Sequence, residues 1–451
     1  MQKIKFSHKS ESYWKLLVKC IICAIAVVIS KISGIGIFSY GALGLYLCMF
    51  IFTDIKDVFS VFMFFLPWTV LLKISPETFS FTSIAFLIVL IRILFKTRGE
   101  FEFKSFLLIF AIAFITCIVK LVNNYPFSMG YVTFFLSLIM MIIFCENYTS
   151  EVSFEQLTVF YAVGIISAAA ISMMTHGNPN INQYMRVFEN EMAVQNQTVN
   201  IQRQCGFYPD PNYFASQVST ALGCVLLISN RTRLKSVVIV GLVIALIAFG
   251  MTSVSKSFMI SVVLILGIWL LTIFKSNTNI HKSFRIITIL FMIVLVALMN
   301  GTFSNLFIEY SARFSTTDNV TSLTTGRSDI WKEYITFLLN NPFDLCFGQG
   351  LTSVLKAFRK GSHNTIIQIF YQLGIFGTLF LSTQLGIVLS IVKKKKNVGR
   401  INLILLTFSC FFMWMGIDVL MWDDFPLIIG LYIMGINYLT TDNVGKRTPV
   451  K

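Results

Sequence analysis

Long uninterrupted apolar runs dominate this chain and restrict it to one class of fold. A helix that crosses the hydrocarbon core of a bilayer needs roughly 20 predominantly apolar residues, and we find about fourteen runs of this kind. Only 13% of the 451 residues are charged. The runs lie near residues 13–31, 35–52, 57–73, 79–95, 104–122, 129–146, 155–174, 212–229, 235–251, 256–274, 284–303, 364–392, 400–420 and 424–440. We therefore predict an all-α polytopic membrane protein with about 12–14 transmembrane helices, 14 being favoured.

The positions of lysine and arginine predict how these helices are oriented. Short cytoplasmic loops of membrane proteins carry an excess of positive charge. With the N-terminus in the cytoplasm, most of the basic residues fall on that side, including Lys3 to Lys15, Arg92 to Lys104, Lys275 to Arg285 and the run Lys393 to Lys396. Both termini are then cytoplasmic. The net charge of +15 is explained by this topology and by anionic lipid head groups, so no nucleic-acid partner is expected.

Two long segments interrupt the alternation of spans and short loops, and both face away from the cytoplasm. Loops of this length usually carry function or are disordered. They divide the chain into N-terminal transmembrane helices that act as a scaffold, a first outer loop, central transmembrane helices, a large outer loop, and C-terminal transmembrane helices with a cytoplasmic tail. The boundaries are 1–174, 175–211, 212–303, 304–363 and 364–451. No internal repeat of the kind common in secondary transporters is visible.

The large outer loop contains an amphipathic helix in the stretch TGRSDIWKEYITFLLNNP, which runs from Thr325 to Pro342. Thr325 or Ser328 can cap its start, and Asn340 to Pro342 end it. Its apolar residues recur with helical spacing along one face. They are Ile330, Trp331, Tyr334, Ile335, Leu338 and Leu339. We expect this helix to lie on the membrane surface or on the transmembrane bundle.

Arg327 falls in the first turn of that helix. Free backbone N–H groups and the helix dipole already favour anions at this position. Arg327 is therefore a candidate phosphate clamp, and the alternative is a solvated arginine beside the helix cap. Arg313, Arg359 and Lys360 in the same loop either attract anionic substrates in general or form a solvated surface.

Two further motifs place basic residues at the outer ends of spans. In RQCGFYPDPNYFASQ, Asp210 or Asn212 can cap the following helix, and Asp210 can orient an arginine such as Arg203. The alternative, favoured by the residues alone, is a turn with ordinary capping. In MTSVSKSFMIS, Lys256 begins a span. Its ammonium either meets a phosphate or reaches the bilayer interface without a partner.

His363 stands where the large outer loop enters a span. A neutral imidazole accepts a proton near neutral pH. A single histidine is more often structural than catalytic. The following helix, however, carries Asn364, Thr365, Gln368 and Gln372 at its outer end, which predicts a polar cavity reaching into the bundle. His363 is therefore our candidate general base.

Carboxylates and cysteines give weaker signals. MWDDF forms an outer turn between the last two spans, with Asp418 just before it. Its carboxylates either bind a divalent cation or act as a base, or form an exposed acidic turn, which we favour. Cys205 and Cys346 are both on the outer side, and we expect two buried thiols in preference to a disulfide. We expect no metal site, because the closely spaced pair Cys20 and Cys23 lies inside the first helix.

Four of these motifs, taken in order, resemble the bacterial superfamily of O-antigen ligases and O-antigen (capsular polysaccharide) polymerases. They are RQCGFYPDPNYFA, MTSVSKS, TGRSDIW with NNPFDLCFGQG, and SHNTIIQIFYQLGIFG. The resemblance covers Arg203 to Gly377. The first six spans match only as a helical scaffold.

The resemblance implies a membrane glycosyltransferase of the C type at the outer face of the bacterial plasma membrane. Such an enzyme uses a polyprenyl-diphosphate-linked oligosaccharide, without a nucleotide sugar, a cofactor or an essential metal. The family's two arginines fall on Arg203 and Arg327, which would bind the diphosphate, and its histidine falls on His363. Lys256 stands where many members have arginine and loses bidentate phosphate recognition. Asp210, Asn212 and Asn364 are the supporting candidates.

Three functions stay open at this stage. We favour a polymerase that joins lipid-linked repeat units of O-antigen or capsule. The closest alternative is a ligase that moves the finished glycan to lipid A core or another acceptor, and both need the same donor site. A flippase or another transporter of lipid-linked oligosaccharide would instead need ionisable residues along a path through several spans. The bilayer is an expected partner, and whether a chain-length regulator binds is left open.

Overall fold

The chain is described by a computed structural model for residues 13–76, 78–96, 104–123, 129–184, 188–194, 197–208, 210–229, 232, 234–275, 285–288, 304–315, 326–355, 361–392 and 399–440. These residues form helices and one β-hairpin, so the predicted all-α class is confirmed apart from that hairpin. The hairpin was not predicted. It lies within the segment that the sequence indicated as the first outer loop.

The first half of the chain is a series of apolar helices. They are α1 (Tyr13–Ser33), α2 (Gly36–Phe52), α3 (Ile55–Phe65) with the 3-10 turn η1 (Leu66–Trp68), α4 (Phe81–Lys96), α5 (Lys104–Val122), α6 (Met129–Tyr148), α7 (Phe154–Met174) and the short α8 (Pro179–Asn182). The hairpin β1 (Phe188–Val194) and β2 (Gln197–Arg203) follows. Its strands pair antiparallel from Phe188 opposite Arg203 to Val194 opposite Gln197.

The second half contains three membrane-type helices, the helices of the large outer loop and the C-terminal group. They are α9 (Pro211–Ser229), α10 (Ser236–Met251), α11 (Lys256–Lys275), α13 (Ser304–Ser315), α15 (Arg327–Asn340), α16 (Pro342–Phe347), α17 (Thr365–Val392), α18 (Arg400–Phe411) with η2 (Phe412–Gly416), and α19 (Asp424–Thr440). Inside α17, Gly374 has a φ of +65° that interrupts the helix. The backbone N–H groups of Gln349 and Gly350 bond to the carbonyls of Tyr371 and Gln372 beside this break.

Among the described residues, five helices are long and apolar enough to cross a membrane: α1, α6, α7, α11 and α17. Another five are apolar but shorter: α2, α5, α10, α18 with η2, and α19. The run predicted at 57–73 is split, because α3 ends at Phe65 and a 3-10 turn containing Pro67 follows. Most of the run predicted at 284–303, together with Lys393 to Lys396 and the C-terminal tail, lies outside the described residues. A membrane protein is thus confirmed, and the number of spans stays a prediction.

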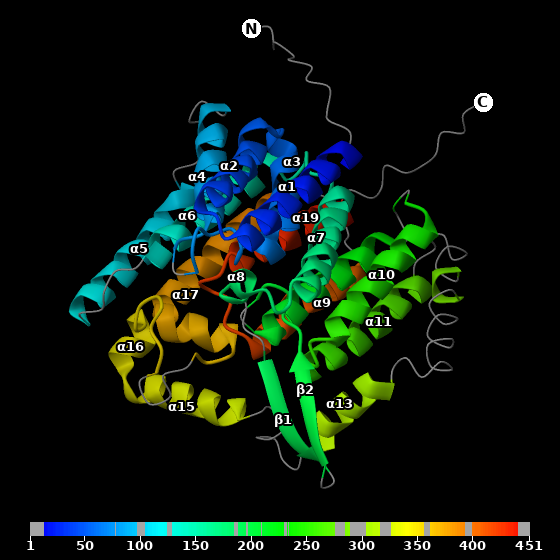
Figure 1. The fold of residues 1–451 in the computed structure, drawn as a ribbon. Coiled ribbons are helices and arrows are strands. Elements are labelled where there is room, and N and C mark those ends of the chain that lie inside the picture. The colour runs from blue at the N-terminus through cyan, green and yellow to red at the C-terminus, as the bar shows by residue number, and fades with distance from the viewer. Residues whose placement is uncertain are drawn as a thin grey trace, which may run out of the picture.

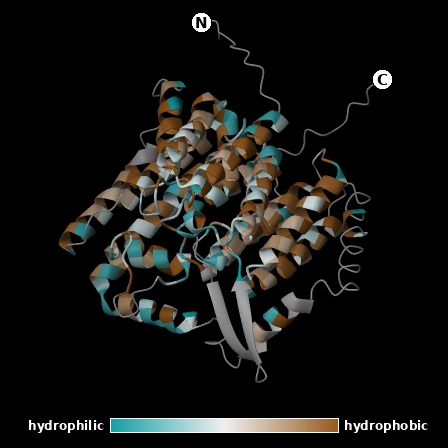
Figure 2. Ribbon diagram, viewed as in Figure 1, coloured by the Kyte–Doolittle hydropathy of each residue, from teal (hydrophilic) through white to brown (hydrophobic). Residues whose placement is uncertain are grey.

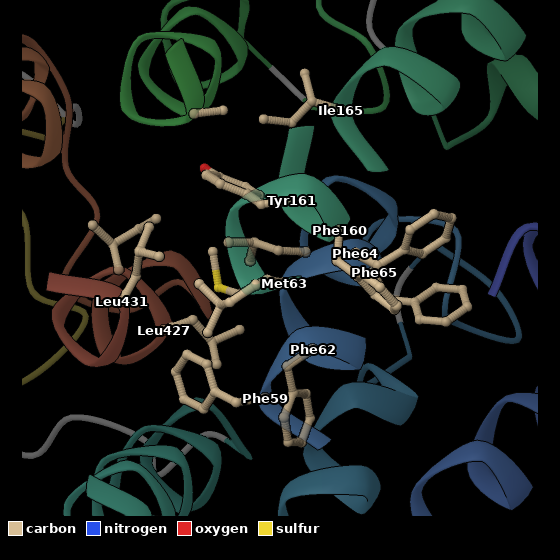
Figure 3. Close-up of a cluster of buried hydrophobic side chains, with 14 of the residues drawn as sticks. Phe59, Phe62, Met63, Phe64, Phe65, Phe160, Tyr161, Ile165, Leu427 and Leu431 are labelled. Atoms are coloured by element: carbon tan, nitrogen blue, oxygen red, sulfur yellow. The ribbon is translucent and has the colours of Figure 1, made fainter. Parts of the chain in front are cut away.

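The hydrophobic core lies where helices rich in aromatic side chains pack against one another. Figure 3 shows Phe59, Met63 and Phe64 of α3 beside Tyr161 of α7 and Leu427 of α19. All five are buried. Close packing of such rings and branched side chains fixes these helices against one another, because dispersion contacts fade quickly with any gap.

Helix α9 lies at the centre of the molecule. It packs against α7, α10, α11 and α18, and all of its residues except Tyr213 are buried. Hydroxyl contacts add to the packing: Ser219 bonds to Ser261 of α11 at 2.5 Å, and Thr220 donates to the backbone carbonyl of Ser409 in α18 at 3.0 Å. The residues at the N-terminus of α9 are therefore attached to a closely packed central helix.

The outer-loop elements gather at one end of this bundle. Figure 1 shows α13, α15 and the hairpin together there, while α1 begins at the opposite end. Figure 2 shows hydrophobic residues along the helices of the bundle and hydrophilic residues on α15 and in the loops between it and the bundle. Helix α15 contacts α16 and α17, and α13 contacts α11 and the hairpin. This arrangement brings the sequence motifs of both outer loops to the same end.

Candidate active site

The Asp418 carboxylate holds the segment that carries His363. Oδ2 of Asp418 accepts the backbone N–H of His363 at 2.9 Å. Oδ1 accepts the Ser362 hydroxyl at 2.7 Å and the backbone N–H of Asn364 at 3.0 Å. Asp418 is 9% exposed. A largely buried carboxylate with three donors is well satisfied, so this contact fixes the loop firmly.

His363 lies immediately before α17. Asn364 caps this helix, because its Oδ1 accepts the backbone N–H groups of Ile366 at 3.0 Å and Ile367 at 3.3 Å. His363 has a φ of +49°, a left-handed conformation that is uncommon for a residue other than glycine. Its side chain is half-buried. Strained conformations of this kind persist where the surroundings hold them, and here Asp418 does so.

The amphipathic helix predicted in the large loop is confirmed as α15. Tyr334 and Leu338 are buried on the expected face, and the rings of Tyr334 and Tyr371 meet edge to face at 4.7 Å. Ile335 and Leu339 of the same predicted face are exposed. The indole N–H of Trp331 donates to the carbonyl of Ser362 at 2.9 Å, so α15 is tied directly to the histidine segment.

The prediction for the start of α15 is wrong about the residue that caps the helix and right about the position of Arg327 in its first turn. Gly326, with a φ of +79°, is the N-cap, and no side chain caps the helix. Ser328 is therefore not the cap, and Thr325 lies outside the described residues. Arg327 is the first helical residue, so it belongs to the turn whose backbone N–H groups have no partner within the helix.

The guanidinium of Arg327 reaches the C-terminal helices. A Cβ atom on Gly416 would lie 2.9 Å from Nη1 of Arg327, so the guanidinium lies close against the backbone of Gly416. Burial lowers the pKa of Arg327, while the carboxylates of Asp210 and Asp418 act in the opposite direction. Arg327 is thus a largely desolvated cation within electrostatic reach of two acidic side chains, Asp210 and Asp418.

Arg203 ends β2 and binds the turn between α10 and α11. Its Nε donates to the carbonyl of Ser253 at 2.9 Å, and its side chain is 7% exposed. The backbone N–H of Gln204 bonds to the carbonyl of Thr252 at 3.0 Å. The hairpin therefore delivers Arg203 to the turn that immediately precedes Lys256.

Asp210, Asn212 and Ser255 connect that turn to the central helix. Oδ1 of Asp210 accepts the backbone N–H of Asn212 at 2.6 Å and its side-chain amide at 2.8 Å. The hydroxyl of Ser255 donates to Oδ1 of Asn212 at 2.9 Å. The predicted cap of α9 by Asp210 is confirmed. Lys256 is 9% exposed, with Nζ 5.5 Å from the ring centroid of Phe314.

The structure thus brings the candidate residues of four separate segments to one end of the bundle. Arg203 donates to the carbonyl of Ser253, and Ser255 in the same turn donates to Asn212. Burial lowers the pKa of Arg327, and the carboxylate of Asp210, close to Asn212 in the chain, acts to raise it. The carboxylate of Asp418 also acts to raise the pKa of Arg327, and the same carboxylate accepts the backbone N–H of His363. The side chain of Arg313 and residues Arg359 and Lys360 lie outside what the structure describes.

The predicted polar cavity lies beside the histidine segment. It measures about 220 Å³. Gln368 and Gln372 of α17 line it together with Ser362, Asp418 and Trp422, as well as other residues of α9, α15 and the 352–354 loop. Tyr213 stands at its wall, and its hydroxyl donates to the backbone carbonyl of Asp418 at 2.6 Å.

The favoured expectation of an exposed acidic turn around MWDDF is wrong. Asp418 and Asp424 are both buried. Asp424 is held by Gln217, whose amide donates to Oδ1 at 2.7 Å, and it contacts the Tyr208 hydroxyl. Burial of a carboxylate is tolerated only with such donors. An aspartate embedded in an apolar run, as Asp418 is in MGIDVLM, was the available signal for such a partner.

Cys205 and Cys346 are both free thiols, as the sequence favoured, although Cys346 is only half-buried. Cys205 is buried, and burial raises the pKa of its thiol to about 12. The thiolate, which is the reactive form, is therefore not populated at neutral pH. Cys205 packs beside the site without offering it a nucleophile.

A comparison with protein families bears directly on this arrangement. Residues 240–382 match the model of a family described as O-antigen ligase. This confirms the resemblance to the O-antigen ligase and polymerase superfamily. The matched residues include Lys256, Arg327, His363 and Asn364, while Arg203, Asp210 and Asp418 lie outside them. None of the curated proteins compared with the chain matches it. The match supports a function of the O-antigen ligase or polymerase type without separating the two.

Proposed function

We propose that the protein is a membrane glycosyltransferase that joins polyprenyl-diphosphate-linked oligosaccharide repeat units at the outer face of the bacterial plasma membrane. The observation that supports this most is a chain of contacts that links three distant segments: Asp418 holds the His363 segment, and the carboxylates of Asp210 and Asp418 act on the pKa of Arg327. Arg203 joins this chain through the turn in which Ser253 accepts its Nε and Ser255 bonds to Asn212. Two cations suit a diphosphate, and a neighbouring imidazole suits the activation of a hydroxyl.

The arginines act on the leaving group. In this mechanism Arg327 and Arg203 bind the diphosphate of the donor, with the first turn of α15 adding backbone N–H groups. Charge grows on the phosphate oxygen as its bond to the anomeric carbon breaks. Cations fixed in advance at that position stabilise the transition state, and one such contact is worth roughly 3–4 kcal/mol in the best-measured cases. Lys256 adds a third charge at the α10–α11 turn.

His363 acts on the acceptor. Its imidazole takes the proton from the attacking sugar hydroxyl while the oxygen forms the new bond to the anomeric carbon. The lipid diphosphate leaves with the electron pair of the broken bond. Attack from the face opposite the leaving group inverts the anomeric centre. General-base catalysis of this kind contributes roughly 10²- to 10⁴-fold in rate.

A ligase is the second candidate, because the matching family is described as O-antigen ligase. The same donor site and the same base serve both reactions. In a ligase the acceptor is lipid A core or another molecule, and in a polymerase it is the next lipid-linked repeat unit. The size distribution of the product on its lipid carrier distinguishes them.

The test is the surface polysaccharide of a host that lacks the gene, complemented by wild type, His363→Ala or His363→Asn. Asparagine tolerates the left-handed backbone at this position better than most residues, so His363→Asn keeps the loop conformation and removes the base. We expect wild type to restore a ladder of glycan lengths and both variants to leave single repeat units.

Two results would contradict the proposal in different ways. Long glycan that accumulates on its lipid carrier in the null host identifies a ligase. Full complementation by both histidine variants removes His363 from the mechanism and favours a transporter, because a flippase needs no base at this position.

A further inference from the structure

A second and larger cavity lies on the N-terminal half of the molecule. It measures about 570 Å³, within the range of roughly 300–1,000 Å³ typical of small-ligand pockets. The loop between η1 and α4, the start of α6 and the turn before α19 form its walls. By the predicted topology all three segments are on the outer side, as is the candidate active site.

The walls of this cavity are fixed before any ligand arrives. Nζ of Lys31 donates to the carbonyls of Lys73 and Ile74, and the Tyr184 hydroxyl donates to the carbonyl of Ile74 at 2.6 Å. The backbone N–H of Phe81 bonds to the carbonyl of Leu72 at 2.7 Å. A loop pinned at this many points loses little conformational entropy on binding, which favours a specific ligand.

The lining combines hydroxyls, aromatic faces and one pair of opposite charges. Thr69, Thr78, Ser80, Ser83 and Thr133 supply the hydroxyls, Phe79 and Trp422 the rings, and Lys73 and Asp423 the charges. Hydroxyls both donate and accept, and the rings offer apolar faces. This mixture fits a saccharide, whose ring has polar edges and apolar C–H faces. Val70, Met129 and Met421 add apolar surface between these groups. A phosphate would need an excess of cations, and Lys73 is balanced by Asp423.

Trp422 and Met421 line both cavities, the large one and the one beside Asp418. The indole of Trp422 packs on the ring of Tyr213 at a centroid distance of 5.2 Å. The Tyr213 hydroxyl bonds to the carbonyl of Asp418, whose carboxylate holds His363. The large cavity and the cavity beside Ser362 and Asp418 therefore share the side chains of Met421 and Trp422.

We infer that the cavity lined by Thr133, Phe79 and Trp422 is the binding site for the acceptor saccharide. The inference rests on the proposed function and assigns its two substrates to different places. The donor diphosphate lies with Arg203 and Arg327, and the acceptor sugar lies on the far side of Trp422. The reacting hydroxyl is presented over this side chain toward His363.

A binding titration tests the inference without requiring turnover. The probe is the free oligosaccharide repeat unit, released by mild acid from the lipid-linked unit of a host that lacks the gene. The full-length protein is held in lipid nanodiscs, and binding is followed by saturation-transfer NMR. Thr133→Trp fills the cavity. Val132→Trp is the matched control, because Val132 is the preceding residue of α6 and is 58% exposed.

We expect Thr133→Trp to weaken oligosaccharide binding tenfold or more, while Val132→Trp and His363→Asn bind like wild type. Phe79→Ala is a second variant that spares the fold, since Phe79 is 45% exposed. It should weaken binding and raise the KM for acceptor with little change in kcat. Equal binding by wild type, Thr133→Trp and Phe79→Ala overturns the inference, even if the purified protein transfers glycan. Loss of binding in both variants supports the inference. This holds even if the purified protein shows no glycan transfer and the proposed function is therefore wrong.

Discussion

The Asp418 carboxylate accepts the backbone N–H of His363 at 2.9 Å although the two residues are 55 positions apart in the chain. The candidate base is thus positioned through its own main chain by the segment between η2 and α19. The positioning contact uses the backbone N–H of His363 and not its imidazole.

Asp418→Asn should slow glycan transfer chiefly by lowering kcat. Asparagine keeps one accepting oxygen but presents an NH₂ group toward one of the backbone N–H groups that Asp418 now accepts. A buried donor left unpaired costs roughly 1–3 kcal/mol, so we expect kcat to fall about 10- to 100-fold. Steady-state kinetics with purified lipid-linked substrate measure this.

The matched control is Asp344→Asn, which makes the same change in α16 of the large loop. It should leave kcat unchanged. A wild-type rate in Asp418→Asn, or an equal loss in both variants, would show that the contact with His363 does not position the base.

Gly361→Ala should disturb the same contact from the other side. A Cβ atom at residue 361 would overlap Oδ2 of Asp418, so the carboxylate or the loop must move. We expect lower activity and a lower thermal midpoint in detergent. Gly386→Ala in α17 is the control, because a Cβ there meets no other atom within 4 Å. A fully active Gly361→Ala protein would mean that the loop adapts freely.

Arg327→Lys should raise the KM for donor and lower kcat together. Lysine keeps the charge but loses the planar fork that matches a phosphate with two hydrogen bonds. We expect a loss of about tenfold or more in kcat/KM, corresponding to roughly 1.4 kcal/mol. Lys332→Gln, an exposed position on the same helix, should behave like wild type. If the lysine variant were fully active, a bidentate contact would be excluded.

Asp423→Asn should stabilise the protein at neutral pH. Burial raises the pKa of Asp423 from 3.8 to about 6 in the folded protein, although Lys73 opposes this shift. Between these two values the folded state binds the proton more tightly than the unfolded state, so stability falls as the pH rises through this window. Asparagine removes that loss.

Thermal midpoints of wild type and Asp423→Asn in detergent, measured from pH 4 to pH 8, test the sign. The variant should be the more stable at pH 7.5, and the two curves should converge near pH 4. A variant that is less stable at pH 7.5 would show that the ionised carboxylate is stabilised by Lys73 more than it is penalised by burial.

The sequence predicted the individual helices better than the tertiary contacts between them. The spacing of Tyr334 and Leu338 was sufficient for α15, since helical periodicity is a local property. The run of polar residues after His363 likewise predicted the cavity lined by Gln368 and Gln372. That Arg327 reaches Gly416 could not be predicted, because the contact depends on how the large loop folds back over the bundle.

The burial of Asp418 is a second feature that could not be predicted from the sequence. Its surroundings in the sequence are apolar, and its neighbours Asp423 and Asp424 suggested a solvated turn. Its burial depends on three donors supplied by residues 362–364, which no local pattern pairs with it. The hairpin was missed for a different reason: its strands pair only with each other, at the edge of a helical bundle where few strands are expected.

The dependence of the His363 segment on Asp418 has a consequence for how the protein is made. Membrane proteins are inserted as they are synthesised, so α17 and the whole large loop leave the ribosome before α18, η2 and the Asp418 turn exist. The residues that match the family model end at 382, yet the carboxylate that orders their histidine comes later. A nascent chain that stopped after α17 would carry His363 and Arg327 without the group that arranges them. The arrangement of the His363 segment is therefore complete only when the final helices of the protein are in place.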